Sequence, residues 1–239
     1  SMFDVHTEEE LKEFMNIVKE KKQKSKRIMA GDRPEFWPAS GGRSVYMANN
    51  SFVTGLISRI AEQKGIDYIA TFVRRVLSSG RYPEAVFLFA GYGELDLMDC
   101  LSQLIYEFPG RVGYNNSWLS DTDPSGIYFH AHRALDCFIS PSKFEPFGIG
   151  VLKALCLGAV CMVSDKQGHK STVRTIGIKE LGINEEPDAN GARFPTDDWN
   201  FENTINNMMS AFDRLYTLWK NKEADPSWSK MVENSLFSD

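Results

Sequence analysis

The chain has 239 residues, of which 42% are hydrophobic and 25% are charged, and this balance excludes a disordered tail, a collagen-like fibre and a coiled coil. The formal charge of −5 argues against an extended nucleic-acid surface, which usually needs a basic domain. The sequence holds no run of about 18 apolar residues, so we expect no membrane span. These quantities predict a globular, soluble protein of one large domain or two small ones.

The four cysteines, Cys100, Cys137, Cys156 and Cys161, form no Cys-x-x-Cys pair and have apolar neighbours in the sequence. We expect them to be buried, reduced thiols, because a disulfide staple is unusual in a chain of this size. The first residues do not combine a basic start with an apolar stretch, so they do not resemble a secretory signal. Both observations predict a protein of the reducing cytoplasm.

A first helix is predicted by Thr7 and Glu10, which have the spacing of a capping box and precede apolar residues at helical intervals. The basic cluster Lys19–Arg27 follows. It has two interpretations, a nuclear-import or polyanion patch, and cations that complete a helix C-terminus and face water, of which we favour the second. Residues 31–44 show no regular period. We therefore expect residues 1–50 to be an N-terminal helix and an irregular linker.

From residue 51 onward, short apolar runs alternate with amphipathic stretches. The runs at 52–57, 85–90, 135–139 and 159–163 predict strands, and the stretches at 67–79, 94–107, 149–157 and 204–222 predict helices. Fully apolar strands between helices indicate a sheet that is covered on both faces, hence a parallel sheet of βαβ units. Residues 51–239 are thus predicted to be an α/β, Rossmann-like domain. Ligands of such sheets bind at the carboxyl ends of the strands.

Arg59 and Lys64 follow the first predicted strand directly, five residues apart. A guanidinium offers a planar fork to phosphate oxygens, and an ammonium offers a mobile point charge. Gly65 permits a close backbone approach and the start of a helix. The two cations therefore form a candidate phosphate site, and the alternative is a pair of surface cations near a turn.

Two further patterns carry weak signals. Gly91-Tyr92-Gly93 follows a strand as in a dinucleotide-binding motif, but Asp96 stands where the third glycine belongs, so a tight turn is favoured over a nicotinamide site. His130 and His132 are two residues apart without a third candidate ligand, so we expect no metal.

The segment Pro141–Leu155 turns at two prolines after an apolar strand and begins a helix near Gly148. A helix N-terminus supplies unpaired N–H donors and partial positive charge, which suit a diphosphate. Glu145 does not favour phosphate, but it can accept hydrogen bonds from the hydroxyls of a sugar. The alternative is that Glu145 only interacts with the helix dipole.

The segment Ser164–Val173 has the same organisation, because a strand precedes it and Gly168 leads into a polar helix start. His169 by itself is more commonly a surface histidine than a catalytic one.

Taken in order, these segments resemble the donor-binding, C-terminal half of the GT-B retaining glycosyltransferases, and in particular the glycogen and starch synthase family. The stretch 59–65 resembles the family's R-L-x-x-Q-K-G, 141–148 resembles P-S-R-F-E-P-C-G, and 165–173 lies where the family has T-G-G-L-x-D-T-V. The likeness extends from about Asn50 to the C-terminus. It implies one half of a GT-B fold, with an acceptor-binding N-terminal domain that this sequence does not include.

The resemblance also implies roles for individual residues. Arg59 and Lys64 would neutralise the diphosphate of a nucleotide-sugar as it leaves, and Glu145 would bind hydroxyls of the donor sugar. The backbone amides near Phe147, Gly148 and Ile149, and those at Gly168 and His169, would hold the sugar or the phosphate. The longer loop 114–128 does not allow the family's base-stacking tyrosine to be placed by spacing, and Tyr114 is offered as a candidate. Family members need no bound metal or other cofactor, and the donor nucleotide, ADP-, UDP- or GDP-linked, stays open.

Three features depart from the family pattern. Lys153 stands eight residues after Glu145, where the family has an acidic or aromatic residue; Gln167 and His169 replace Gly and Leu; and the loop 114–128 is longer. We predict the donor-binding domain of a metal-independent, retaining glycosyltransferase, which in isolation binds the donor without efficient transfer. The alternatives are a nucleotide-sugar-binding or regulatory module that has lost catalysis, and a GT-B-like epimerase.

Overall fold

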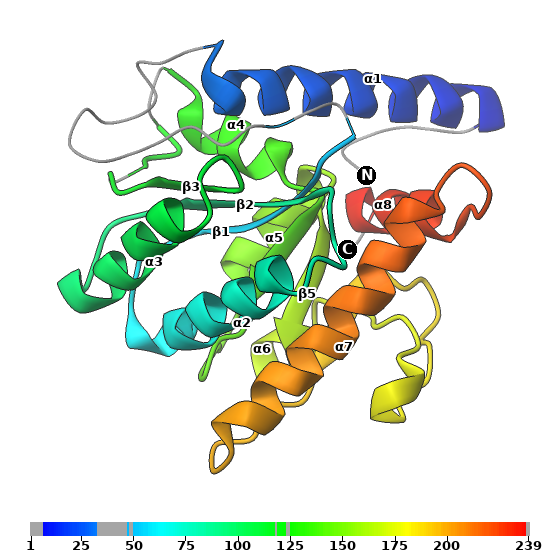
Figure 1. Ribbon diagram of the computed structural model, residues 1–239. Helices are drawn as coiled ribbons and strands as arrows, with labels where there is room; N and C mark the ends of the chain where they lie inside the picture. The colour runs from blue at the N-terminus through cyan, green and yellow to red at the C-terminus, as the bar shows by residue number, and fades with distance from the viewer. Residues whose placement is uncertain (1–6, 33–46, 48–49, 118, 123–124, 238–239) are drawn as a thin grey trace.

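The computed structural model describes residues 7–32, 47, 50–117, 119–122 and 125–237. Within these residues, the strands form one parallel six-stranded sheet with the order β3-β2-β1-β4-β5-β6 (Figure 1). The strands are β1 Phe52–Ile57, β2 Ala85–Ala90, β3 Val112–Asn115, β4 Cys137–Ser140, β5 Val160–Ser164 and β6 Gly191–Phe194. Along the chain, β1 to β3 run outward to one edge of the sheet, and β4 to β6 run outward to the other edge. The order of the strands therefore reverses between β1 and β4, while all strands stay parallel.

Helices cover both faces of this sheet. The helices are α1 Glu8–Arg27, α2 Ile66–Ser78, α3 Leu95–Glu107, α4 Ile127–Ala134, α5 Ile149–Cys156, α6 Gln167–Lys170, α7 Phe201–Lys220 and α8 Ser227–Leu236. On one face α2 packs against α3 and α7, and on the other α4 packs against α5 (Figure 1). Every residue of β1 to β5 is buried as a result, which accounts for their apolar sequences.

The predicted α/β class is confirmed, and so are the bounds of the strands at 52–57 and 85–90. The other two predicted strands begin one or two residues later than expected, as β5 and β4. The four predicted helices correspond to α2, α3, α5 and α7, with ends that differ by up to three residues. The edge strands β3 and β6 and the helices α4 and α8 were not predicted.

The capping box of α1 is confirmed. The amide of Glu10 donates to the hydroxyl of Thr7 at 3.2 Å, and the amide of Thr7 donates to the carboxylate of Glu10 at 2.9 Å. These reciprocal bonds satisfy two of the amides that a helix leaves unpaired at its start. The helix packs against α4 (Figure 1). Most of the linker predicted at 31–44 lies outside the described residues.

Two lysines of the basic cluster point inward, so the expectation that they face water is wrong. The side chain of Lys26 is only 4% exposed, and its Nζ lies 2.6 Å from Oδ2 of Asp136 and 3.0 Å from the carbonyl of Ser51. The Nζ of Lys22 donates to the carbonyls of Leu135 and Gly158. Asp136, the acidic partner of Lys26, lies at the amino end of β4, 110 residues away. This ion pair attaches the C-terminal part of α1 to the sheet.

All four cysteines are free thiols. Cys137 and Cys161 are buried in β4 and β5 as expected, and Cys100 is partly buried. Cys156 is exposed, against expectation, because it lies on the outer side at the end of α5. Among the described helices, none combines the length and the apolar character that a bilayer crossing requires.

Candidate functional site

The first cationic segment lies at the carboxyl end of β1, as predicted. Arg59 follows the strand by two residues and is exposed, and its guanidinium has no hydrogen bond or ion pair with the part of the chain that the structure describes. Gly65 then begins α2 with a φ of +67°, and a Cβ there would lie 2.3 Å from the carbonyl oxygen of Pro141. Only glycine fits both requirements. This close approach brings the loop after β1 against the loop after β4.

Two hydrogen bonds join these loops. The amide of Lys143 donates to the carbonyl of Gln63 at 2.9 Å, and the side-chain amide of Gln63 donates to the carbonyl of Phe144 at 2.9 Å. Two motifs that are about 80 residues apart in the sequence are therefore in direct contact. The loop after β1 and the loop after β4 thus lie side by side and form one edge of the candidate site, at the carboxyl ends of the strands.

Lys64 and Glu145 meet at this edge. Their Nζ and Oε2 atoms lie 2.6 Å apart, while the amide of Gly148 donates to Oε1 of Glu145 at 3.1 Å. Burial raises the pKa of Glu145, but the ammonium of Lys64 and the amide of Gly148 outweigh it, so the pKa lies below its ordinary value. The carboxylate is therefore ionised and held at neutral pH, with lone pairs available to further donors.

The start of α5 supplies free backbone donors beside that carboxylate. Gly148 precedes the helix with a φ of +71°, and the first helical hydrogen bond runs from the amide of Leu152 to its carbonyl. Within the described residues, the amides of Ile149, Gly150 and Val151 have no acceptor. The side chains of Phe147 and Ile149 are 73% and 60% exposed. The predicted helix N-terminus is thus open, as an anion site requires.

The predicted segment Ser164–Val173 lies next to this edge, but its backbone amides are not available to a ligand as predicted. The amide of Gly168 donates to the carbonyl of Glu145 at 2.9 Å, and the amide of His169 donates to the carbonyl of Lys166 at 3.0 Å. Both amides are therefore occupied, which does not fit the expectation that they hold a sugar or a phosphate. A Cβ on Gly168 would lie 2.4 Å from the carbonyl oxygen of Glu145. Gly168 thus permits the backbone contact that supports the Glu145 loop.

The ring of His169 is buried and bonded at both nitrogens. Nδ1 lies 2.8 Å from the carbonyl oxygen of Ser164, and Nε2 lies 3.4 Å from the hydroxyl of Ser140. Burial lowers the pKa of His169, so the imidazole is neutral. The histidine is a packed side chain that joins β4, β5 and α6.

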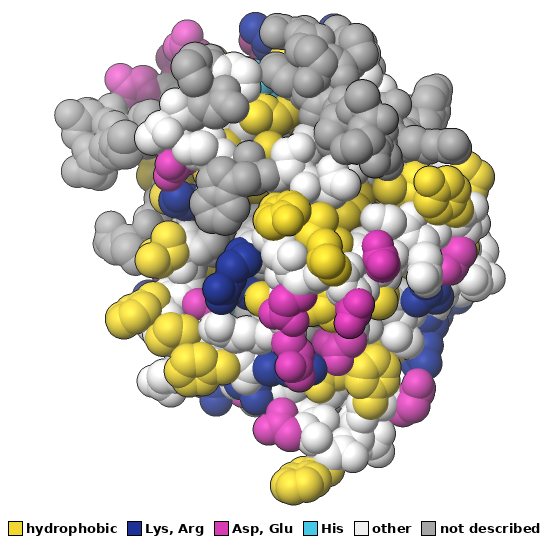
Figure 2. All heavy atoms as spheres, turned by 90° about the vertical axis from the view of Figure 1, so that its left-hand side faces the viewer, with side chains coloured by type: hydrophobic (Ala, Val, Ile, Leu, Met, Phe, Trp, Pro, Cys, Tyr) yellow, Lys and Arg dark blue, Asp and Glu magenta, His cyan; other side chains and the backbone are white. Residues whose placement is uncertain are grey.

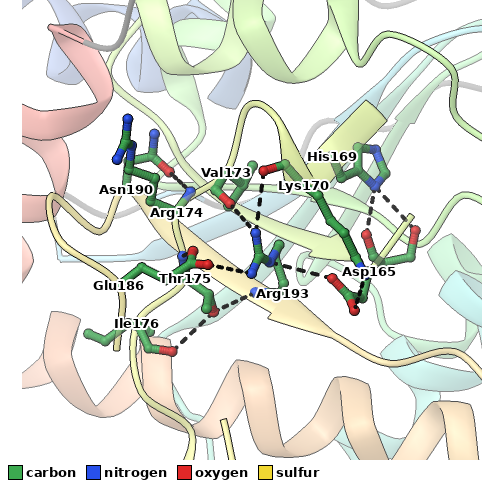
Figure 3. A network of polar contacts seen from close by, with 11 residues as sticks. Asp165, His169, Lys170, Val173, Arg174, Thr175, Ile176, Glu186, Asn190 and Arg193 are labelled. Atoms are coloured by element: carbon green, nitrogen blue, oxygen red, sulfur yellow. Dashed lines mark hydrogen bonds and ion pairs between the residues drawn. The ribbon is translucent and has the colours of Figure 1, made fainter. Parts of the chain in front are cut away.

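Arg193 of β6 organises the rest of this segment (Figure 3). Its Nη2 lies 2.7 Å from Oε1 of Glu186, its Nη1 donates to the carbonyl of Val173 at 3.2 Å, and its Nε lies 3.5 Å from Oδ1 of Asp165. Lys170 also pairs with Asp165, at 3.1 Å. Figure 3 shows that these side chains point toward one another, while the ring of His169 lies apart from them. These ion pairs and hydrogen bonds hold the loop after β5 against β6.

Tyr114 does not lie where stacking on a base would need it. The side chain is 1% exposed in β3, and its hydroxyl donates to the carbonyl of Gly91 at 3.0 Å. The glycines of the Gly-x-Gly pattern have a steric reason, since a Cβ on Gly91 or Gly93 would lie 1.8 Å from a carbonyl oxygen of the loop after β1. The pattern therefore marks a close crossing of two loops.

A pocket of about 260 Å³ opens beside Arg59. Its lining includes Tyr92, Asp121, Tyr128 and Lys153. The Nζ of Lys153 lies 2.9 Å from Oδ2 of Asp121 and 5.0 Å from the centre of the Tyr128 ring. Of these residues, the sequence analysis singled out Lys153 by itself and Tyr92 only as part of the Gly-x-Gly pattern. The position of Tyr92 directly after β2 was a usable signal, whereas Asp121 and Tyr128 lie in and after a long loop without a regular pattern.

This pocket and the Lys64–Glu145 edge share one face of the molecule. Figure 2 shows the face at the carboxyl ends of β1 and β2, where basic and acidic side chains lie close together and large apolar side chains are exposed around them. The exposed apolar residues that follow β2 and β4 are Tyr92, Leu95, Phe144, Phe147 and Ile149, and Trp199 and Phe201 follow β6. His132, by contrast, is buried, and burial lowers its pKa to about 4.

Comparison with known proteins gives three findings. The family model described as "Glycosyl transferases group 1" matches residues 46–189. The glycogen synthases of Alkalilimnicola ehrlichii and Kosmotoga olearia are 29% and 26% identical, over 76% and 78% of this chain but only 36% and 34% of their own lengths. The catalytic domain of starch synthase IV from Arabidopsis thaliana, solved with ADP and acarbose, superposes with a TM-score of 0.67 at 19% identity, over 94% of this chain and 40% of that one. The chain thus spans about a third of the length of these curated relatives.

Proposed function

Because the chain belongs to the glycosyl transferases group 1 family, we propose that it is the donor-binding part of a retaining glycosyltransferase that uses a nucleotide diphosphate sugar. The observation that carries this proposal is the Lys64–Glu145 pair beside the open start of α5, with Arg59 unpaired nearby. Cations and free amides suit a diphosphate, and a fixed carboxylate suits sugar hydroxyls. The three groups lie at the edge where ligands of parallel sheets bind.

In the proposed mechanism Arg59 and Lys64 stabilise the negative charge that develops on the diphosphate as the glycosidic bond breaks. A prearranged cation or donor of this kind is typically worth about 3–4 kcal/mol of transition-state stabilisation. Lys64 also holds Glu145, so the same ammonium links the phosphate side of the site to the sugar side. Side-chain cations take the place of a metal ion here, and we expect donor binding to be insensitive to chelators.

Glu145 would accept hydrogen bonds from donor hydroxyls through lone pairs that Lys64, the Gly148 amide and the Ser142 hydroxyl leave unused. The free amides at the start of α5 would hold a phosphate or a sugar oxygen. In a retaining transfer the acceptor arrives on the face from which the diphosphate departs, and a phosphate oxygen takes its proton. The chain therefore does not need to supply a separate base.

The acceptor would be bound by a second domain outside this sequence. The coverage of about a third of the relatives' length is consistent with this view, and so is the exposed apolar rim around the site, since exposed apolar patches mark interaction surfaces. By itself the chain would bind the donor without efficient transfer. Because the chain is similar to glycogen and starch synthases, a glycogen- or starch-type product is the reference for a first assay, and other acceptors are tested beside it.

The test is calorimetric titration of the chain with nucleoside diphosphates and their sugars, with and without EDTA. We expect binding of one nucleotide class, at least tenfold weaker in Arg59→Ala. Arg81→Ala is the matched control, because its guanidinium forms a surface ion pair with Asp213 at 2.8 Å and lies 5.3 Å from the centre of the Tyr82 ring, outside the pocket. An absence of binding for every nucleotide, or equal binding by both variants, would contradict the proposal.

A further inference from the structure

The pocket beside Arg59 is also lined by a second charged pair that the proposed diphosphate chemistry does not use. Lys153 donates to Oδ2 of Asp121 at 2.9 Å, above the ring of Tyr128. The carboxylate also takes a backbone hydrogen bond from Asp121 itself, and Lys153 is the one side chain among the described residues that donates to it, so acceptor capacity remains for a ligand. Lys153 replaces the acidic or aromatic residue of the family pattern, so the pair is a property of this chain.

The pocket has room for a nucleoside. Its volume of about 260 Å³ lies just below the usual range for pockets that enclose drug-sized ligands, about 300–1,000 Å³. A diphosphate held at Arg59 would leave the base to enter this space. There the base would meet the rings of Tyr92 and Tyr128, which offer flat apolar surfaces, and the polar ends of Asp121 and Lys153.

The two polar groups have opposite hydrogen-bonding capacity. An ionised aspartate only accepts, through two oxygens, and a lysine ammonium only donates. The ammonium of Lys153 lowers the pKa of Asp121, so the carboxylate is ionised at neutral pH. A base that fits the pair without breaking it must present two neighbouring N–H donors to the carboxylate and a carbonyl oxygen to the ammonium.

Guanine presents that edge. Its N1–H and N2–H groups lie side by side and match the two oxygens of a carboxylate, and its O6 lies next to them on the ammonium side. Adenine, cytosine and uracil each place a lone pair where guanine has one of these donors. A lone pair facing a carboxylate oxygen is repulsive and leaves that oxygen unsatisfied, so these bases pay a penalty on entering the pocket.

We propose that Asp121 and Lys153 read the base of the donor nucleotide and select guanine. This inference rests on the proposed nucleotide-sugar function, because it requires the diphosphate to lie at Arg59. Asp121 would accept from N1–H and N2–H, Lys153 would donate to O6, and Tyr128 would support the plane of the base.

The test is the calorimetric affinity of the chain for GDP, IDP, ADP, UDP and CDP. GDP is expected to bind at least tenfold more tightly than the others, including IDP, which lacks only the N2 amino group. Asp121→Asn is expected to remove this preference and to gain affinity for xanthosine diphosphate, whose O2 carbonyl can accept from the new side-chain amide. Asp198→Asn is the control, since Asp198 lies between β6 and α7, outside the pocket, and its ion pair among the described residues is with Lys166, at 3.6 Å.

The outcomes separate the two proposals. A preference for another base that still depends on Arg59 overturns the selection of guanine and leaves the donor site intact. A preference for GDP that Asp121→Asn leaves unchanged overturns the assignment to Asp121. If no nucleotide binds, both the base selection and the donor site are wrong.

Discussion

The Nζ of Lys64 lies 2.6 Å from Oε2 of Glu145, although the two residues are 81 positions apart. Each stands just after a parallel strand, and the strands concerned, β1 and β4, are neighbours in the sheet. Their side chains are 22% and 11% exposed, so the pair is shielded from water on most sides. One ion pair therefore joins the phosphate half of the proposed donor site to its sugar half.

The pair should contribute to stability as well as to binding. We expect Lys64→Met and Glu145→Gln each to lower the free energy of unfolding by roughly 1–3 kcal/mol, because each leaves a partly buried partner without its counter-charge. The double variant should lose less than the sum of the two. Urea unfolding of the four proteins gives the coupling energy, and strict additivity would show that the two groups do not interact.

The Lys64–Glu145 pair also predicts that folding stability depends on pH in the acidic range. The pKa of Glu145 is lowered from its ordinary 4.5 in the folded protein, so the folded state favours the carboxylate. Its contribution is complete above pH 4.5 and is lost as the pH falls through the folded value. The stability difference between wild type and Glu145→Gln should therefore shrink below pH 4.5. A difference that stays constant down to pH 3 would contradict this assignment.

Gly168→Ala should destabilise the site loop by about 1–3 kcal/mol, because its Cβ would lie 2.4 Å from the carbonyl oxygen of Glu145 and backbone must move. The cost is steric, since the φ of Gly168 is not in the left-handed region. Gly150→Ala is the control: its Cβ would meet only the ring of Phe138 at 3.6 Å, and alanine favours the helix. Thermal unfolding of both variants tests this, and equal melting temperatures would refute the contact.

Lys22 predicts that folding stability also depends on pH in the alkaline range. Here the folded state disfavours the charged form of the side chain, whereas it favours the charged form of Glu145. Burial lowers its pKa from 10.5 to about 8, with Asp136 acting against this and Lys26 adding to it. The unfolded chain therefore binds more protons than the folded one between pH 8 and 10.5, and folding stability gains from Lys22 as the pH rises through that window. The gain is on the order of 3 kcal/mol at most. In Lys22→Met this rise should be absent, and denaturation curves of both proteins from pH 7 to 10.5 measure it.

The sequence was sufficient for the parts of the fold whose cause is local. The runs at Phe52–Ile57 and Ala85–Ala90 are continuous and apolar, so their bounds followed directly. The edge strands Val112–Asn115 and Gly191–Phe194 are four residues long and contain glycine, asparagine or arginine, which hide a strand pattern. The inward position of Lys26 could not be predicted from its neighbours in the sequence, because its partner Asp136 lies next to a strand that is distant along the chain.

The same limit applies to the site. Strand ends placed Arg59, Lys64 and Glu145 on one edge, but the sequence held no sign that Lys64 contacts Glu145. The amides of Gly168 and His169 were misjudged because the spacing of a motif does not tell which amides the backbone already uses. The aromatic wall at Tyr128 depends on how a long loop returns to the sheet, and no periodic pattern encodes that path.

The donor site is mapped directly by the change in backbone amide NMR signals of the chain when a nucleotide diphosphate sugar is added. We expect saturable shifts at Ile149, Gly150 and Val151, at the loop after β1 and along the pocket beside Arg59. The basic helix segment Lys19–Arg27 should be unaffected. Shifts confined to that segment would indicate unspecific attraction of a polyanion by α1, and this result would contradict a donor site at the edge of the sheet.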